Sequence, residues 1–385
     1  MMTTKRLLDV CDFQGGTQPP KDEWINDPRE GYVRMLQIRD YSQGDAKFIQ
    51  YVKDTKKLHK CTKDDIMLSR YGYIGQAFIG LEGAYNVALV KVIKKAEIHT
   101  PYLLCYFQSY YFQHFLLSNV GARATIPGFN KDELENALIR IPEMCKQIEI
   151  ASKITKVDEL IGFHKQQLNV LDTLIKSRFI EMFGTLSCNE HHYPMCALKD
   201  ACRKITDGKH GGCEQEYNSG YYYVGAREIY DGEIHYDTAP QIVRGDFEKD
   251  YRRCNLEQGD FVLVNTGATI GKSAIAKHPL TERTLLQKSV AMFKVKTELI
   301  SAVFLKCCYD ANPEMYTVKS ASAQPNLLLS RINSTQIYLP PIELQRQFAA
   351  FVEQVDKSKF YIVQMQILLR LLIRAIQQKT TEVLL

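Results

Sequence analysis

A chain of 385 residues is long enough for about two to three domains, and its 45% apolar and 24% charged residues are typical of a globular protein. Lys and Arg number 49 against 44 Asp and Glu, and this net charge of +5 is too small to establish a polyanionic partner by itself. The 11 cysteines, an odd number with no CxxC pair, argue against a secreted disulfide framework and predict a reducing, cytoplasmic compartment. No apolar run of about 18 residues is present, and Leu7-Leu8 is too short for a signal-peptide core, so we expect no membrane span.

Taken in chain order, the first stretch is residues 1–141. It carries short β-like runs at 66–69 and 87–92, bounded by Gly, Asn and Asp, and an aromatic helical segment near 101–117. We predict an α+β globule here.

A long helix is predicted next, in residues 142–185. Apolar side chains recur at alternating steps of four and three, which is the pattern of a heptad seam. Pro142 suits a helix start and Gly184 a helix end. The predicted core positions of this helix are Ile150, Ile154, Val157, Ile161, Leu168, Leu171 and Ile175.

The same sequence of elements then follows a second time. Residues 186–339 carry β-like runs at 261–264 and 290–295 and a helical segment near 298–310, which predicts a second α+β globule. A second heptad pattern follows Pro340-Pro341 and predicts a helix in 340–385. Its predicted core positions are Phe348, Val352, Val355, Ile362, Leu369 and Ile373.

The second half of the chain repeats the first. The segment Asp65–Gln76 returns as Asp260–Lys272, and from Pro142 and Pro340 onward a constant offset of 198 pairs Gln147 with Gln345 and Leu171 with Leu369. A period near 195 residues is the size of a domain and too long for a solenoid unit. We predict two copies of a domain-plus-helix module with pseudo-two-fold symmetry, in which the two helices pack as an antiparallel coiled coil.

These features together resemble the specificity (S) subunit of type I restriction-modification enzymes. The resemblance rests on Leu7-x-Asp-Val-Cys with Gly15-Gly16-Thr17, on Asp-Ile-x-Leu-x-Arg70-x-Gly, on the turn Ser322–Asn326, and on Ile337-x-Leu-Pro-Pro-Ile-x-x-Gln345 before a long helix. It covers essentially the whole chain, twice. The first copy departs from it at Pro142, a single proline, and at Gly162 and His164 within the seam.

The resemblance implies an organisation and a function. Residues 1–141 and 186–339 would each be a target recognition domain that reads one half of an asymmetric bipartite site in double-stranded DNA. The helices in 142–185 and 340–385 would set the spacing and dock two methyltransferase subunits, and in many complexes restriction subunits as well. No cofactor is expected in this chain, because AdoMet, ATP and Mg²⁺ would belong to the partner subunits.

Motifs for catalysis are not apparent in the sequence. Neither proline pair, Pro19-Pro20 or Pro340-Pro341, has the flanking residues with which an adenine methyltransferase holds a flipped base. The segment Gly267–Ser273 has three residues between its glycines where a phosphate-binding loop needs four, and we interpret it as a tight turn. The Cys and His residues between Cys188 and Cys213 lack the regular spacing of a zinc site, so no metal is predicted.

DNA-contact candidates follow from chemistry, because Arg and Lys suit guanine, Asn and Gln suit adenine, and many donors suit phosphate. In the first globule the candidates are Gln37, Arg39, Arg70, Tyr73, Asn86 and Arg123. In the second they are Lys209, His210, Arg227, Asn265, Thr269, Lys272 and Gln287. The alternative for each is a solvated loop side chain. The repeat places Arg70 opposite Asn265 and Gln76 opposite Lys272, which predicts two different half-sites.

Two other functions stay open at this point. One is a coiled-coil scaffold that binds proteins and no DNA. The other is a fused restriction or methylation enzyme, against which the missing motifs argue. The target bases cannot be deduced from the sequence, since DNA shape contributes to recognition as well as side-chain identity.

Overall fold

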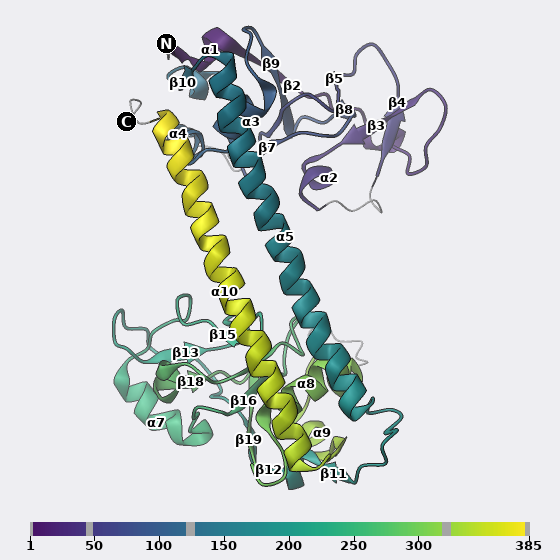
Figure 1. Ribbon diagram of the computed structural model, residues 1–385, viewed down its shortest axis with the longest axis vertical. Coiled ribbons are helices and arrows are strands. Elements are labelled where there is room, and N and C mark those ends of the chain that lie inside the picture. Colours follow the sequence, from purple (N-terminus) through teal and green to yellow (C-terminus); the bar gives the residue numbers. More distant parts are fainter. Residues whose placement is uncertain (1–2, 44–48, 121–127, 318–324, 382–385) are drawn as a thin grey trace. The chain divides into compact units, whose positions relative to one another are not determined.

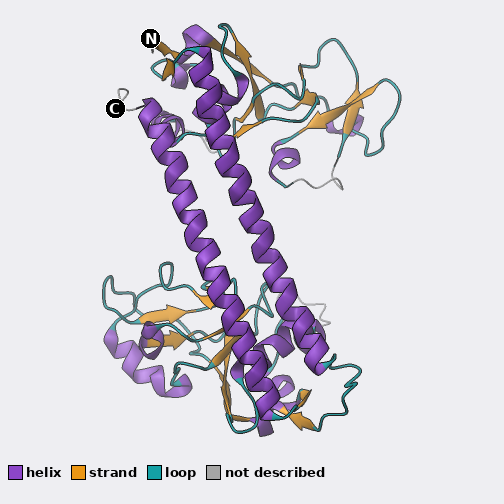
Figure 2. Cartoon of the chain, in the orientation of Figure 1, coloured by secondary structure: helices purple, strands orange, loops and turns teal. Residues whose placement is uncertain are grey.

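A computed structural model describes residues 3–43, 49–120, 128–317 and 325–381 of the chain (Figures 1 and 2). The chain forms two compact units, one made of Met1–Lys165 with Val363–Leu385 and the other of Gln166–Ile362. Each unit therefore combines one globular module with part of each long helix.

Unit 1 holds the first module. Its helices are α1 (Leu7–Val10), α2 (Ile38–Ser42), α3 (Thr100–Phe107), α4 (Tyr110–Asn119) and the first part of α5 (Met144–Phe183). Its strands are β1 (Thr3–Arg6), β2 (Cys11–Gly15), β3 (Tyr32–Leu36), β4 (Tyr51–Lys53), β5 (Lys60–Cys61), β6 (Met67–Ser69), β7 (Ala77–Phe78), β8 (Gly83–Tyr85), β9 (Leu89–Lys94) and β10 (Leu138–Ile141). They form an antiparallel sheet in the order β2-β9-β6-β7, a mixed sheet in the order β4-β3-β8-β5, and the pair β1-β10.

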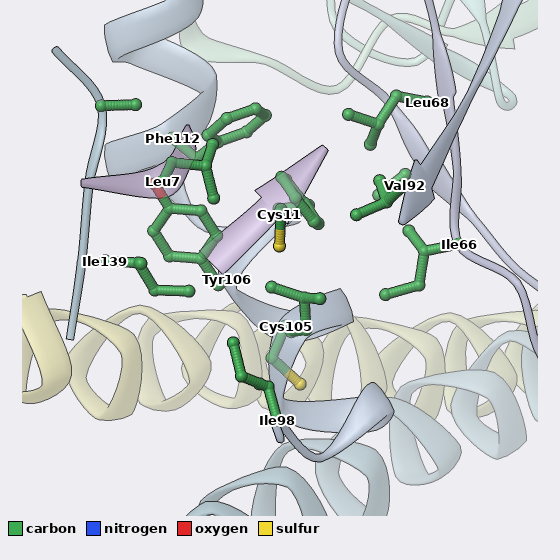
Figure 3. Packing of buried hydrophobic residues seen from close by; sticks show 14 of the residues in the cluster. Leu7, Cys11, Ile66, Leu68, Val92, Ile98, Cys105, Tyr106, Phe112 and Ile139 are labelled. Carbon is green, nitrogen blue, oxygen red and sulfur yellow. The ribbon is translucent and has the colours of Figure 1, made fainter. Parts of the chain in front are cut away.

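The core of unit 1 lies between the antiparallel sheet and the helices. Leu7 and Cys11 pack with Tyr106 and Phe112 from the aromatic helices α3 and α4 (Figure 3). Ile150 and Ile154 of α5 belong to the same buried cluster, and Ile373 and Ile376 near the end of α10 (Ile342–Thr381) pack against it. The unit is thus completed by residues from both long helices.

Unit 2 holds the second module. Its helices are the end of α5, then α6 (Leu198–Ala201), α7 (Arg244–Cys254), α8 (Ala302–Ala311), α9 (Leu329–Ser334) and the first part of α10. Its strands are β11 (Met195–Ala197), β12 (Cys202–Asp207), β13 (Tyr222–Val224), β14 (Ile229–Tyr230), β15 (Glu233–Ile234), β16 (Phe261–Val264), β17 (Ser273–Ile275), β18 (Thr284–Leu286), β19 (Val290–Val295) and β20 (Gln336–Tyr338). Four rings from three helices, Phe179, Phe183, Phe304 and Phe348, meet edge-on or tilted at 4.9–5.5 Å between centroids in its core.

The two modules repeat one strand arrangement. The sheet order β2-β9-β6-β7 of the first module recurs as β12-β19-β16-β17, the pair β1-β10 recurs as β11-β20, and the parallel pair β3·β8 recurs as β13·β18. Asp65 and Asp260 also correspond, because each accepts the backbone N–H three residues before it at 2.8 Å. The predicted α+β fold with an internal repeat is therefore confirmed.

The long helices α5 and α10 have 40 residues each and lie within the ranges expected from the heptad pattern. Within unit 2 they run antiparallel, because Phe348 contacts Phe179 whereas Lys359, further along α10, pairs with Asp172, further back along α5. All thirteen predicted core positions are buried or half-buried. The heptad seam thus faces protein along its described length.

A buried glutamine joins the first turn of each long helix to its module. Gln147 donates to the carbonyl of Pro142 at 2.8 Å and accepts the N–H of His99 at 2.9 Å. Gln345 donates to the carbonyls of Pro340 and Leu299 and accepts the N–H of Ser301 at 2.9 Å. Each carboxamide therefore satisfies an N–H at the start of the aromatic helix, which fixes where the long helix leaves the module.

One helix of the described residues, in the span Ile342–Gln378, has the length and mean hydropathy (1.3) of a membrane-crossing segment. The helix meets this criterion of length and composition because α10 carries apolar residues outside its seam as well as in it. A single helix that passes this test is weak support for membrane insertion, and the first turns of α10 bury Phe348 and Val352 in the core of unit 2.

Candidate nucleic-acid interface

In both modules, candidate side chains gather where a pair of parallel strands ends. Gln37 follows β3 and Asn86 follows β8, and the N–H of Asn86 donates to the carbonyl of Leu36 at 3.1 Å. In unit 2, Gly225 follows β13 and Gln287 follows β18, and the N–H of Gln287 donates to Val224 at 2.8 Å. We call this region of each module the strand-end site. The matching hydrogen bonds establish that Asn86 corresponds to Gln287.

The turn after the first strand of each pair is closed by an acidic side chain. Asp40 accepts the N–H of Gln37 at 2.8 Å, and Glu228 accepts the N–H of Gly225 at 2.8 Å. Position 37 therefore corresponds to 225, and Arg39 corresponds to Arg227. The strand-end site thus carries an arginine at the same place in both modules.

The two arginines differ in their surroundings. The side chains of Arg39 and Gln37 both donate to the Oε1 atom of Gln50, at 2.9 and 3.3 Å. Arg227 is exposed, and no hydrogen bond or ion pair of its side chain occurs among the described residues. The first site is therefore braced by Gln50, whereas the second leaves its guanidinium free for a ligand.

A glycine in each module lets a third segment cross the strand ends. A Cβ atom on Gly16 would lie 2.0 Å from the carbonyl oxygen of Asn86, and one on Gly208 would lie 2.1 Å from that of Leu286. The next residues, Thr17 and Lys209, donate their N–H groups to Tyr85 and Leu286 at 3.0 and 2.7 Å. Lys209 and His210 are thereby placed beside the second strand-end site.

Carboxylates hold these side chains in the second module. Lys209 pairs with Asp250 at 2.8 Å, and this hydrogen bond raises the pKa of Lys209. Asp207 accepts from His210 at 3.1 Å and from the guanidinium of Arg253. Burial of Asp207 acts to raise its pKa, but Arg253 and His210 outweigh burial and hold the pKa below the ordinary 3.8. Sequence reasoning missed Arg253, because its helix carries no motif of its own.

Arg70 and Asn265 do correspond, as the repeat predicts, but their side chains are engaged inside the protein. Their N–H groups donate to Ala88 and Ser289 at 2.8 and 3.0 Å. The Nε of Arg70 donates to the carbonyl of Phe129 at 3.1 Å, and its guanidinium also reaches Asn130. Asn265 is only 3% exposed and donates to Leu327 at 3.4 Å. Both side chains hold a neighbouring loop, and Asn265 offers no surface to a base in this structure.

The other candidates lie on turns around this region. Tyr73 is 79% exposed, Lys272 is exposed and Thr269 half-exposed. Gln76 and Lys272 occupy equivalent places, because their carbonyls accept from Ser69 and Val264. Arg123 lies outside the described residues, as do Ser322, Ala323 and Gln324 of the Ser322–Asn326 turn.

The segment Gly267–Ser273 is a tight turn, as expected. Gly271 has a φ of 97°, its N–H donates to Val264 at 3.0 Å, and a Cβ atom there would lie 2.4 Å from the ring of Tyr316. Among the residues that the structure describes, no three His, Cys, Asp or Glu side chains gather as a metal site would require. Burial raises the pKa of the Cys202 thiol to about 12, which is unfavourable for a thiolate ligand.

These observations define a class of protein: a duplicated α+β module, each copy followed by a forty-residue helix and each with amide and cationic side chains at the end of a parallel strand pair. Residues 1–173 and 197–371 match the model of the type I restriction modification DNA specificity domain, and the chain belongs to this family.

Curated relatives and solved structures agree with this assignment. The chain is 25% identical over 371 residues to the type I restriction enzyme MjaVIII specificity subunit of Methanocaldococcus jannaschii, covering 91% of this chain and 85% of the relative. It is 21% identical, with the same coverage, to the MjaIX specificity subunit of that organism. The S subunit of M. genitalium has the same fold, with a TM-score of 0.54, 14% identity, and coverage of 99% and 96% of the two chains. A chain from work on complex assembly and conformational transition of the type I R-M system gives a TM-score of 0.61 at 14% identity, with coverage of 98% and 97%.

Proposed function

We propose that this chain is the DNA sequence-recognition subunit of a type I restriction-modification complex, and that each module reads one half of an asymmetric bipartite site. The observation that carries the proposal is the strand-end site, which occurs once in each module on the same backbone but with different side chains: Gln37 and Asn86 in one, Gly225 and Gln287 in the other. Equivalent sites with unlike side chains suit two unlike half-sites.

The chain itself is non-catalytic in this proposal. Two methyltransferase subunits, and in a complete complex restriction subunits, supply the chemistry and bind AdoMet, ATP and Mg²⁺. The cytoplasm is the compartment in which such a complex meets DNA.

Docking of two like methyltransferase subunits on the helices is part of the proposal. On α5, Phe163, Val170 and Leu174 are 44–64% exposed. At the constant offset of 198, Tyr361, Leu368 and Leu372 of α10 are 48–71% exposed. Exposed apolar side chains at matching places on both helices suit two copies of one apolar partner surface. They also suit the second candidate function, a scaffold that binds proteins and no DNA.

The test is DNA binding by the chain co-purified with its methyltransferase partner, followed by selection of bound sequences from random duplexes. We expect enrichment of two short motifs separated by a fixed gap, with an affinity that falls steeply as salt rises, because Lys and Arg displace counterions from phosphates. The chain alone should transfer no methyl group. A complex that assembles but binds duplex DNA without sequence preference would leave the scaffold function as the better account.

A further inference from the structure

Lysines are concentrated in residues 53–63 of the first module, from the end of β4 to just beyond β5. This segment, which we call the basic loop, contains five lysines and one aspartate, and all five lysines are exposed. They are Lys53, Lys56, Lys57, Lys60 and Lys63. The Nζ of Lys60 donates to Oδ2 of Asp54 at 2.7 Å. Among the described residues, the other four side chains have no ion pair or hydrogen bond.

The second module has a different distribution of charge in the corresponding part of the chain. The segment before Asp260, the counterpart of Asp65, contains α7, in which four Lys and Arg residues alternate with three carboxylates. Arg244 of this helix pairs with Glu248 at 2.6 Å. The repeated fold therefore does not require a lysine-rich segment at this place.

The backbone of the basic loop is held against the module. The N–H of Asp54 donates to the carbonyl of Gly31 at 2.8 Å. The side chain of Leu58 packs against the buried cluster that contains Met35 and Val52. The lysines thus extend from a backbone whose path is already fixed, so a ligand would have to order only their side chains.

The basic loop reaches the strand-end site of the first module at His59. The carbonyl of His59 accepts the N–H of Tyr85, the residue before Asn86, at 3.2 Å. The N–H of His59 donates to the hydroxyl of Thr17 at 3.4 Å, and its Nδ1 lies 2.6 Å from the carbonyl oxygen of Gly15. His59 therefore joins the loop to the end of β8 and to the segment that crosses it. A duplex at the strand-end site would lie beside the loop.

We propose that the basic loop binds the phosphate backbone of duplex DNA beside the half-site that the first module reads. The proposal rests on the proposed function and deepens it, because it assigns a surface that supplies affinity without base selection. Duplex DNA carries one negative charge about every 1.7 Å along its axis, and the ammonium group of lysine suits phosphate whatever the base. A lysine without a carboxylate partner exchanges only water and counterions for phosphate, so no internal ion pair is lost.

The experiment uses the complex of the full chain with its methyltransferase partner and measures the dissociation constant for a selected duplex at several salt concentrations. Lys56→Gln combined with Lys57→Gln should weaken binding and make the slope of log K against log[salt] shallower by about one to two, since each phosphate contact contributes about 0.9. Ethylation of phosphates beside one half-site should no longer interfere with binding. The base preferences of both half-sites should stay unchanged, because phosphate contacts carry no sequence information.

Two matched variants test whether the effect is local. Lys5→Gln combined with Lys199→Gln removes the same charge from two exposed lysines, on β1 and α6, and should keep the parent slope. Lys56→Arg combined with Lys57→Arg keeps both charges in the loop and should also keep the parent slope. Circular dichroism and co-purification with the methyltransferase partner verify the fold of each variant.

Each remaining outcome has a definite meaning. If the glutamine variant of the basic loop keeps the parent slope, the loop does not bind phosphate, although the proposed function stands as long as the parent complex selects a sequence. An equal fall in slope for the Lys5 and Lys199 control would show an effect of net charge and overturn the proposal as well. A changed base preference would mean that these lysines contact bases. A parent complex that selects no sequence overturns the proposed function itself.

Discussion

The buried glutamine at the start of each long helix stabilises the junction between that helix and its module through hydrogen bonds. Gln345 is fully buried and makes three hydrogen bonds, to groups before α8, before α10 and at the N–H of Ser301. A buried N–H or carbonyl left without a partner costs about 1–3 kcal/mol. The carboxamide is therefore a structural link between two helix starts.

We predict that Gln345→Ala lowers the free energy of unfolding of the chain by about 2–4 kcal/mol, because the N–H of Ser301 loses its hydrogen-bond acceptor and a small cavity is left. Urea denaturation followed by circular dichroism measures the change. Gln354→Ala, which removes an exposed carboxamide from the same helix, should cost less than about 0.5 kcal/mol. Equal losses for the two variants would contradict the role assigned to Gln345.

Asp207 gives the second module a dependence on acid. Its pKa is held below 3.8 in the folded chain, so the folded state binds fewer protons than the unfolded state as pH approaches that value. The stabilisation is fully present above pH 3.8 and is lost as pH falls below it. Asp207→Asn should therefore flatten the fall in melting temperature below pH 4 while lowering stability at pH 7. A variant whose acid profile parallels that of the parent chain would count against this coupling.

The sequence did not predict which single side chains are buried or bonded inside the protein. Arg70 and Asn265 were correctly paired by the repeat, yet their surface position on a turn was an inference from residue type alone. Their side chains bond to loops about 60 residues further along the chain, at Phe129 and Leu327, and no local pattern encodes such a contact.

At the scale of elements, the long helices were the easiest to predict. A seam of apolar residues every three or four positions over more than 30 residues has few other interpretations. The strands of the strand-end site have only three to five residues each, too few to show a period, and β3 and β8 pair across 46 intervening residues. Their parallel pairing, which brings Gln37 to Asn86, could be seen only in three dimensions.

The phenylalanine cluster of unit 2 links both long helices to the second module. Phe348→Ala should lower the free energy of unfolding by about 3–5 kcal/mol, because its fully buried ring contacts Phe179, Phe183 and Phe351. Differential scanning calorimetry measures the shift. Phe360→Ala, on the same helix but 59% exposed, is the matched control and should have little effect on stability. A large loss in the control alone would mean that the heptad register of α10 has been assigned to the wrong face.

At the scale of the whole molecule, the proposal makes the helices a spacer between two reading modules. Deleting one heptad from both, residues 163–169 and 361–367 at the constant offset of 198, keeps the seam in register on either side. Each helix becomes shorter by about 10 Å, close to the length of about three base pairs. Selection from random duplexes should then return the same two half-sites with a shorter gap.

Removing the heptad from α5 alone is the control for this prediction, since it shifts one helix against the other. This variant should lose stability and select no single gap. If the matched deletion binds the original gap as well as the parent complex does, the helices do not set the spacing.

The composition of unit 1 also constrains how the chain matures on the ribosome. Ile373, Ile376 and Gln377 are synthesised long after the first module, yet the two isoleucines pack against its buried cluster and Gln377 donates to the carbonyl of Cys105 at 3.4 Å. More than 200 further codons are therefore translated after the first module before the residues that cover its apolar surface are made. A premature stop codon shortly before residue 373 would therefore destabilise the first module and leave the second module nearly complete. Proteolysis would then begin in the first module, about 200 residues or more before the mutated codon.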